Sequence, residues 1–256
     1  MPGMSEFAPD GTRIYRHDAP EDTLAVADTS GGCREAFERH LGRVLGAEPM
    51  VFHELISDVV HVDIYIYPPT SARPYTVLAT SGMSDLPMAV PEVVQEDSLA
   101  EGHGSLERAE LLLALPPEWP LTQEAFEAER HYWPVRLLKG TARLPHLYRT
   151  WLGIGHTVPN GDPARPYAPG TELSGIVLLP PVLDELKELG DPEKVPELRF
   201  YAVVPLTTEE MDLKLTYGLE TLLNHLNEAG ATELLTPDRV SATPSPKRSW
   251  WQRLRG

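Results

Sequence analysis

Two pairs of a histidine and an aspartate are the groups in this chain whose side chains could do chemistry together. His61 and Asp63 stand two residues apart in a segment with strand character, so their side chains share one face and could meet. His156 and Asp162 form a second pair in the segment GIGHTVPNGDP. A histidine supported by a carboxylate can bind a metal ion or act as a base. Three or four such ligands together would form a metal site.

A structural role for both pairs competes with this catalytic interpretation. Neither spacing matches a known metal-binding motif, and the chain contains no H-E-x-x-H sequence. His61 and Asp63 can tie neighbouring strands together, and the run Asn160-Gly161-Asp162-Pro163 is typical of a turn. The sequence therefore favours the structural role and predicts no catalytic residue, no metal and no cofactor. A metal-dependent hydrolase that uses both pairs is the alternative.

Residues 73–88, RPYTVLATSGMSDLPM, read as a strand that runs directly into a polar turn. The turn, residues 81–85, combines two small hydroxyl groups, a glycine that is free to adopt positive φ, and an acid. Such a turn can form a polar binding surface at the end of a rigid sheet. It is not a nucleophile elbow, because Leu86 stands where the G-x-S-x-G motif needs its second glycine.

Other signs of catalysis or of nucleotide binding are missing from the sequence. The chain has no GxGxxG motif and no Walker loop. Its one cysteine, Cys33, excludes an internal disulfide and a cysteine metal cage, and no base is near it in sequence. There is no apolar signal region near the start and no run of about 18 apolar residues, so we expect a cytoplasmic protein.

The charge of the chain is strongly uneven. The net charge is −16, and the last 18 residues hold five basic residues and no acid. Residues 1–238 therefore carry 17 basic and 38 acidic residues, a net charge of −21. Such a surface repels nucleic acid and favours a cationic partner. The alternative is that the charge only keeps the protein soluble.

The hydrophobic pattern predicts short strands and helices between proline-rich loops, since 26 of the 256 residues are proline. The segment 106–115 fits a strand or a helix, and its short apolar run before two prolines favours a strand. Thr207 and Glu210 form a capping box, with one apolar helix face running from there to Gly230. The other predicted strands are 51–56, 61–67, 74–81, 153–158, 174–179 and 197–205, and the other predicted helices are 34–46, 122–132, 134–144 and 181–189.

These elements predict a single α+β domain with a mixed or antiparallel sheet flanked by helices. Residues 1–30 are polar and predict a loosely ordered N-terminal segment, followed by the domain at 31–235. Residues 236–256 lack apolar periodicity and predict a disordered basic tail. The Trp250-Trp251 pair in this tail could lie on an anionic membrane or on an acidic surface.

Six separated segments of the chain resemble the suppressor of fused (SUFU) domain family. They are HVDIYIYPPT (61–70), TSGMSDLPM (80–88), WPVRLLKGTARLPH (133–146), WLGIGHTVPNGDP (151–163), TELSGIVLLPP (171–181) and FYAVVPLTTEEMDLKL (200–215). The resemblance implies a bacterial-type, single-domain member that binds other proteins and is not an enzyme. In animals the domain belongs to a protein that sequesters a transcription factor, and bacterial relatives are proposed to be immunity proteins that neutralise toxins.

The resemblance also implies a place for the partner. The implied protein-binding residues are Tyr75, Ser81, Gly82, Met83, Ser84 and Asp85. A peptide strand from the partner could add beside the strand that precedes the turn, with side-chain pockets giving specificity. A cationic toxin domain is the other form of partner that the acidic chain suits.

Overall fold

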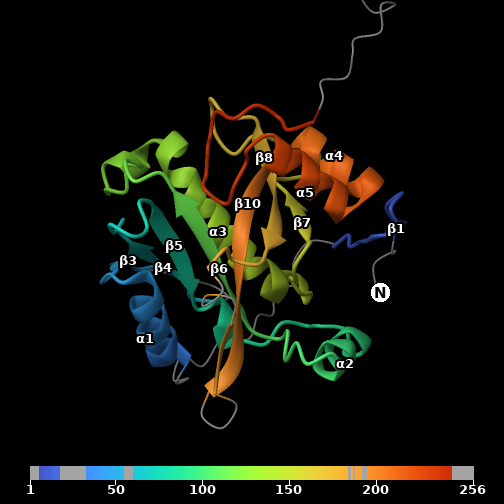
Figure 1. Ribbon diagram of the computed structural model, residues 1–256, viewed down its shortest axis with the longest axis horizontal. Helices are drawn as coiled ribbons and strands as arrows, with labels where there is room; N and C mark the ends of the chain where they lie inside the picture. The colour runs from blue at the N-terminus through green and yellow to red at the C-terminus, as the bar shows by residue number, and fades with distance from the viewer. Residues whose placement is uncertain are drawn as a thin grey trace, which may run out of the picture.

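The computed structural model describes residues 6–17, 33–54, 60–183, 186, 188–191 and 195–243. Its centre is a mixed eight-stranded sheet with helices packed on both faces, which confirms the predicted α+β class (Figure 1). The strands of this sheet are β3 (Met50–Phe52), β4 (Asp63–Tyr67), β5 (Thr76–Ser81), β6 (Ala109–Leu115), β7 (Thr157–Pro159), β8 (Leu173–Leu179), β9 (Glu188–Asp191) and β10 (Val195–Thr207).

The strand order is β3-β4-β5-β6-β10-β8-β7, and β9 pairs with β10. Neighbouring strands are antiparallel except β6 and β10, which run parallel through four residue pairs. This parallel ladder ends at the pair Leu112–Ala202. Beyond it the two strands separate, and residue Leu234 bridges Ala114 while the Leu235 amide donates to the Ala114 carbonyl at 2.9 Å.

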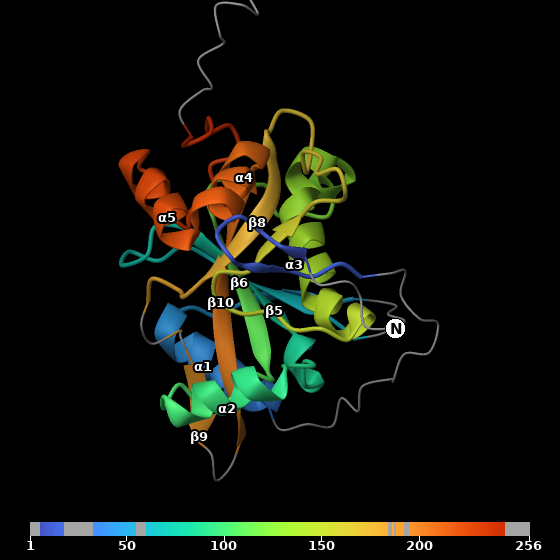
Figure 2. The same cartoon turned by 90° about the vertical axis from the view of Figure 1, so that its right-hand side faces the viewer.

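Side-chain alternation along the strands explains why helices cover both faces of the sheet. On one face, Ile64, Ile66 and Leu78 pack with Trp133 and other residues of α3 (Glu129–Tyr148). On the other face, two helical units pack against separate parts of the sheet. α1 (Cys33–Leu45) covers the β4–β5 end, and α4 (Thr208–Tyr217) with α5 (Leu219–Glu228) covers the β8–β10 end (Figure 2).

The remaining elements are short and lie outside these layers. They are the N-terminal hairpin β1 (Glu6–Phe7) and β2 (Arg13–Ile14), the 3-10 turns η1 (Met83–Asp85) and η2 (Ala125–Glu127), and the helix α2 (Glu92–Ala100). None of the helices in the described ranges is long and apolar enough to cross a membrane.

Each predicted strand overlaps an observed one, and the strand predicted at 106–115 is β6, but the strand predicted at 153–158 shares only residues 157 and 158 with β7. Three helix predictions are wrong. A single helix, α3, replaces the two predicted between residues 122 and 144 and contains both Pro134 and Pro145. The predicted helix from Thr207 begins with its capping box but divides at Gly218, where φ is 90°. Residues 188 and 189, the end of the predicted 181–189 helix, belong to β9.

Both ends of the described chain are more closely packed than the sequence predicts. In the N-terminal hairpin, the Asp10 amide donates to the Leu215 carbonyl of α4 at 3.3 Å. Near the C-terminus, Arg239 forms an ion pair with the buried carboxylate of Glu210 at 2.5 Å, and the Ala242 amide donates to the same carboxylate at 2.7 Å. The packed domain therefore includes residues 236–243, whereas residues 244–256 of the predicted tail lie outside the described part.

Candidate functional site

The two most distinctive motifs of the sequence, the His61–Asp63 pair and the 81–85 turn, form one site. The antiparallel register of β4 and β5 places Asp63 opposite Ser81. The chain around Gly82 then passes so close to His61 that a Cβ on Gly82 would clash with the His61 carbonyl oxygen. Gly82 also has φ at +125°, a conformation that residues with a side chain rarely adopt. Glycine is therefore required at this turn both for its backbone angle and for its close packing.

A buried carboxylate holds the turn in place. Glu110 of β6 is 1% exposed, and its Oε1 accepts hydrogen bonds from the Gly82 amide at 2.9 Å, the Ser84 amide at 3.0 Å and the Ser84 hydroxyl at 2.6 Å. Its Oε2 accepts from the Thr80 hydroxyl at 2.6 Å. Burial raises the pKa of Glu110, and these four hydrogen bonds oppose the rise. The turn is rigid because its donors converge on one acceptor.

The backbone amides of Gly82 and Ser84 are therefore occupied within the domain and do not face a partner. Other contacts bury the turn further: Met83 and Ser84 are 0% and 4% exposed, and Ser81 is 7% exposed. The Met83 carbonyl lies 2.9 Å from His146 Nε2, and Arg108 donates to the Ser84 carbonyl. Of the proposed binding residues in the turn, only Asp85 keeps an accessible side chain, and it is half-buried.

Asp63 links three elements of the fold at the same end of the sheet. Its carboxylate, 1% exposed, accepts from Arg34 of α1 and from the Glu54 amide at 2.9 Å. His53 Nδ1 and His61 Nε2 lie 3.1 and 3.0 Å from its two oxygens. Burial acts to raise the pKa of Asp63, but these hydrogen bonds outweigh it and hold the pKa below its usual value. The pair thus ties α1, β3 and β4 together, as the structural interpretation expects.

The surface of this site carries charges of both signs. Arg34, His53 and His61 cover Asp63 and expose 46%, 66% and 38% of their side chains. Asp85 lies near these basic side chains: burial raises the pKa of Asp85, and the electrostatic influence of Arg34, Arg108 and His61 opposes that rise. Asp85 is therefore surrounded by basic groups of its own chain instead of standing alone in solvent.

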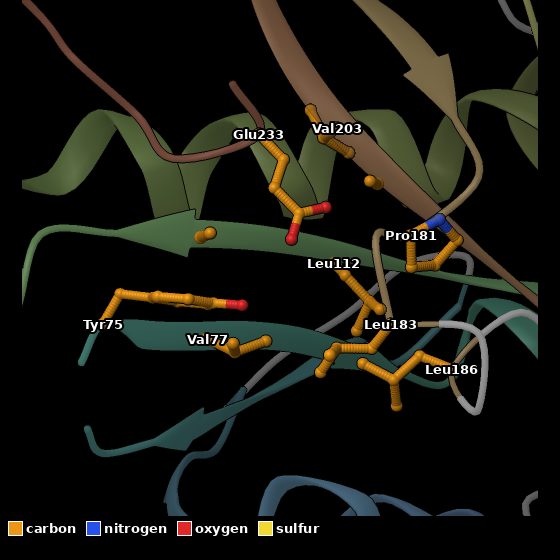
Figure 3. Close-up of a pocket in the computed structure, with 10 residues that line it drawn as sticks. Tyr75, Val77, Leu112, Pro181, Leu183, Leu186, Val203 and Glu233 are labelled. Carbon is orange, nitrogen blue, oxygen red and sulfur yellow. The ribbon is translucent and has the colours of Figure 1, made fainter. Parts of the chain in front are cut away.

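Tyr75, the remaining proposed binding residue, lies at the opposite end of β5. The strand between it and the turn has six residues, a separation of about 20 Å. The Arg73 guanidinium lies 5.4 Å from the Tyr75 ring centroid. In Figure 3 the ring lines a small cavity together with Val77 and Leu112, and the Glu233 carboxylate points toward the cavity from above. The cavity volume is about 20 Å³, about that of one water molecule, so this end of the strand is a separate and small site.

A partner strand cannot add beside β5, which corrects the binding mode implied by the resemblance. β5 pairs with β4 through residues 77–81 and with β6 through residues 76–79. The next position is also closed, because the Leu111 amide donates to the Thr80 hydroxyl at 2.8 Å. Both sides of the strand are therefore already occupied.

The second histidine–aspartate pair does not come together. His156 packs edge-on against Trp151 with ring centroids 4.4 Å apart, and burial lowers its pKa to about 4. Asp162 is exposed and forms an ion pair with Arg16 at 3.3 Å. In the part of the chain that the structure describes, no group of three or more metal-ligating side chains could hold an ion. The metal-dependent hydrolase therefore gains no support from the described residues.

Glu110 is the residue of this site that the sequence motifs do not reveal. It is the one charged residue in the strand AELLLAL, whose other side chains are all apolar and buried. A lone acid inside a buried strand is a usable signal, because such a group needs hydrogen-bond donors aimed at it. The sequence does not show which donors these are, since they come from a turn almost 30 residues earlier in the chain.

Comparison with known proteins agrees with this architecture. The family model of the suppressor of fused protein (SUFU) matches residues 58–240. A suppressor of fused homologue from Neisseria gonorrhoeae FA 1090 shares the fold with a TM-score of 0.58 and 17% identity, over 82% of this chain and 96% of that one. A search of curated proteins finds no match.

Two further solved structures share the fold. One is that of the Sufu–Fu complex, with a TM-score of 0.56 and 16% identity over 81% of this chain and 91% of that one. The other is Drosophila Suppressor of Fused, with a TM-score of 0.57 and 17% identity over 89% of this chain and 52% of that one. With the family model matching well over half of its residues, this chain belongs to the suppressor of fused family.

Proposed function

We propose that this chain is a non-catalytic protein-binding domain and that it serves as a cytoplasmic immunity protein, which neutralises a cationic toxin. Two findings support protein binding: the family to which the chain belongs, and the structural similarity to Sufu, which has been solved in a complex with Fu. The net charge of −21 over residues 1–238 supports a cationic partner, because opposite charge speeds encounter and suppresses wrong partners.

The observation that carries the proposed site is the set of hydrogen bonds around Glu110. They fix the 81–85 turn, so that Asp85 is held beside Arg34 and His61 on a surface that does not need to be ordered on binding. A preorganised surface loses little conformational entropy when a partner docks. The half-buried Asp85 carboxylate can form a hydrogen-bonded ion pair with a basic side chain of the partner.

A partner strand has a better place than β5 at this end of the sheet. β3 is the edge strand, and in the described ranges it pairs only with β4. Met50 of this strand is 59% exposed, and His53 follows the strand directly. A peptide added along β3 would therefore run toward the charged surface around Asp63, with main-chain hydrogen bonds giving affinity and the charges giving specificity.

The test uses the product of any toxin-like gene found next to the gene of this chain. The full-length protein and this candidate are purified, and the affinity is measured by isothermal titration calorimetry alongside rescue of growth in cells that express the toxin. Asp85→Arg should weaken binding by about 2 kcal/mol or more, roughly 30-fold, as for a charge reversed at the centre of an interface. The matched control is Asp97→Arg. It makes the same charge change at an exposed position of α2, outside the charged surface around Asp63 and Asp85.

The outcomes separate the parts of the proposal. Binding without growth rescue would keep the protein-binding function and remove the immunity role. Unchanged affinity in folded Asp85→Arg protein would place the interface elsewhere, with the acidic helix faces as the next candidate. A loss of melting temperature without a loss of affinity per folded molecule would show that Asp85 only supports the turn.

A further inference from the structure

A groove with a cavity volume of about 710 Å³ lies beside the start of α3, away from the charged site. The buried Trp133 and Leu235 belong to its lining, and Trp119 stands at its side. The other walls are built from proline-rich segments of three separate parts of the chain. They are residues 116–120, 168–171 and 234–238.

The aromatic lining of this groove is fixed in place. The Trp119 ring meets Trp133 edge-on with centroids 6.3 Å apart, and Trp133 stacks on Tyr167 at 5.1 Å. The Trp119 indole N–H donates to the His131 carbonyl at 3.0 Å. A cavity of this size, with rigid aromatic and proline walls, fits bulky apolar side chains that can stack on indole rings.

The rim of the groove has a net negative charge. The exposed acids Glu118 and Asp238 line it, and among the described residues Arg130 is the one Lys or Arg side chain that lines it. The rim also includes His131, whose Nε2 accepts from Arg130 Nε at 3.1 Å. An occupant with an aromatic centre and basic flanks would therefore complement both the walls and the rim.

The chain itself contains a segment of this composition a few residues after the groove wall at 234–238. Residues 244–256, PSPKRSWWQRLRG, hold two tryptophans and four basic residues and no acid. The described chain ends at Thr243, where the neighbouring Ser241 hydroxyl accepts from Thr207 at 3.1 Å (Figure 1, red end of the ribbon). Asp238, on the groove wall, is five residues earlier and so at most about 17 Å away. Trp250 is seven residues beyond Thr243 and can reach about 24 Å.

We propose that residues 244–256 fold back on their own domain, with the Trp250-Trp251 pair in the groove and the basic residues beside Glu118 and Asp238. Packing of residues 236–243 supports this arrangement, because Asp238 lies on the groove wall and the ion pair of the next residue, Arg239, with Glu210 fixes the chain there. The inference is independent of the proposed function, since the groove shares no residue with the charged site.

Chymotrypsin cleavage of the full chain after Trp250 or Trp251, followed by mass spectrometry, measures the docking. Docked tryptophans should be cleaved at least about tenfold more slowly than those in a synthetic peptide of residues 244–256, because cleavage follows the population of the open form. The double variant Glu118→Lys with Asp238→Lys should raise the rate in the full chain by about tenfold, from two reversed rim charges. Both positions are exposed, so the variant should keep its fold, which circular dichroism verifies.

The matched control is the double variant Glu92→Lys with Glu228→Lys, which makes the same change of net charge at exposed sites on α2 and α5. It should leave the protection unchanged. Cleavage of the wild-type chain as fast as the free peptide would overturn the proposal, as would equal protection in the two double variants. Protection that increases with protein concentration would assign the groove to a second copy, and protection seen only with anionic vesicles would assign the segment to a membrane. Either result would overturn docking within one chain.

Discussion

Replacement of Glu110 tests the central claim about the 81–85 turn, that one buried carboxylate organises it. Glu110→Ala removes the acceptor of four hydrogen bonds from Thr80, Gly82 and Ser84. Each buried donor left without a partner costs about 1–3 kcal/mol. The loss of stability should therefore be about 4 kcal/mol or more, a large part of the total stability of about 5–15 kcal/mol of a typical domain.

Glu110→Gln is the gentler variant, which should still fold. The glutamine oxygen can keep the three donors that reach Oε1, namely Gly82 and the two groups of Ser84. The glutamine NH2 group must then face Thr80 Oγ1 and donate to it. The hydroxyl proton of Thr80 loses its acceptor, which should lower the stability by about 1–2 kcal/mol. Removal of the buried charge offsets part of that loss, so the net change near neutral pH should stay within about 2 kcal/mol.

The pH dependence distinguishes the charge from the hydrogen bonds. Burial raises the pKa of Glu110 in the folded state above its ordinary value of 4.5. The folded state then holds the proton more tightly than the unfolded state, so the contribution of this group to stability falls as pH rises from the unfolded pKa through the folded one. The wild-type protein should therefore lose stability relative to Glu110→Gln as the pH rises above the ordinary value of 4.5.

Urea unfolding followed by tryptophan fluorescence at a series of pH values measures these differences. Glu107→Gln, at an exposed position in the same segment, is the matched control and should track the wild type at each pH. A Glu110→Ala protein as stable as the wild type would refute the role of Glu110 in the turn. A difference between wild type and Glu110→Gln that does not change with pH would refute the raised pKa.

Three further predictions concern the rest of the molecule. Leu222→Ala should lower the free energy of unfolding by about 2–5 kcal/mol because Leu222 is 0% exposed. Leu223→Ala, at a 37% exposed neighbouring position, should change it by less than about 0.5 kcal/mol. Equal effects of the two variants in urea unfolding would show that α5 packs with a different face toward the core. Arg239→Ala should lower the free energy of unfolding by about 3–5 kcal/mol because it leaves the buried Glu210 carboxylate without its cation. A melting temperature equal to that of the wild type would show that residues 236–243 do not stabilise the domain. Untagged protein should contain no stoichiometric transition metal by elemental analysis, and metal that is lost on changing His61 would contradict the structural role of the His61–Asp63 pair.

Local patterns predict the strands well because each depends on a short apolar run between turn residues. Helix ends are predicted less well where tertiary packing compensates for a local defect. Pro134 and Pro145 remain inside α3, whose buried face includes Trp133 and Leu138, so burial offsets the missing backbone hydrogen bonds. The opposite happens at Gly218. The apolar pattern in the sequence continues across this position, but the positive φ of Gly218 interrupts the helix.

The site could be predicted only in pieces. The 81–85 turn and the His61–Asp63 pair are both visible as sequence motifs, but their union depends on the register that places Asp63 opposite Ser81. A shift of that register by one residue would turn Asp63 to the other face of the sheet. The contribution of Glu110 depends in the same way on the pairing of β5 with β6. Long-range strand pairing is the information that no local pattern contains.

The separation of β6 and β10 beyond Leu112 also bears on the order in which the chain can fold. Residue 114 completes its pairing with residues 234 and 235, which leave the ribosome about 120 residues after it. The parallel pairing of β6 with β10 likewise joins segments about 90 residues apart in sequence. Contacts of such long range slow folding, because a large loop must close before they form. The antiparallel strands β3 to β6 can assemble early, and we expect the complete sheet to close only after residue 235 has been translated.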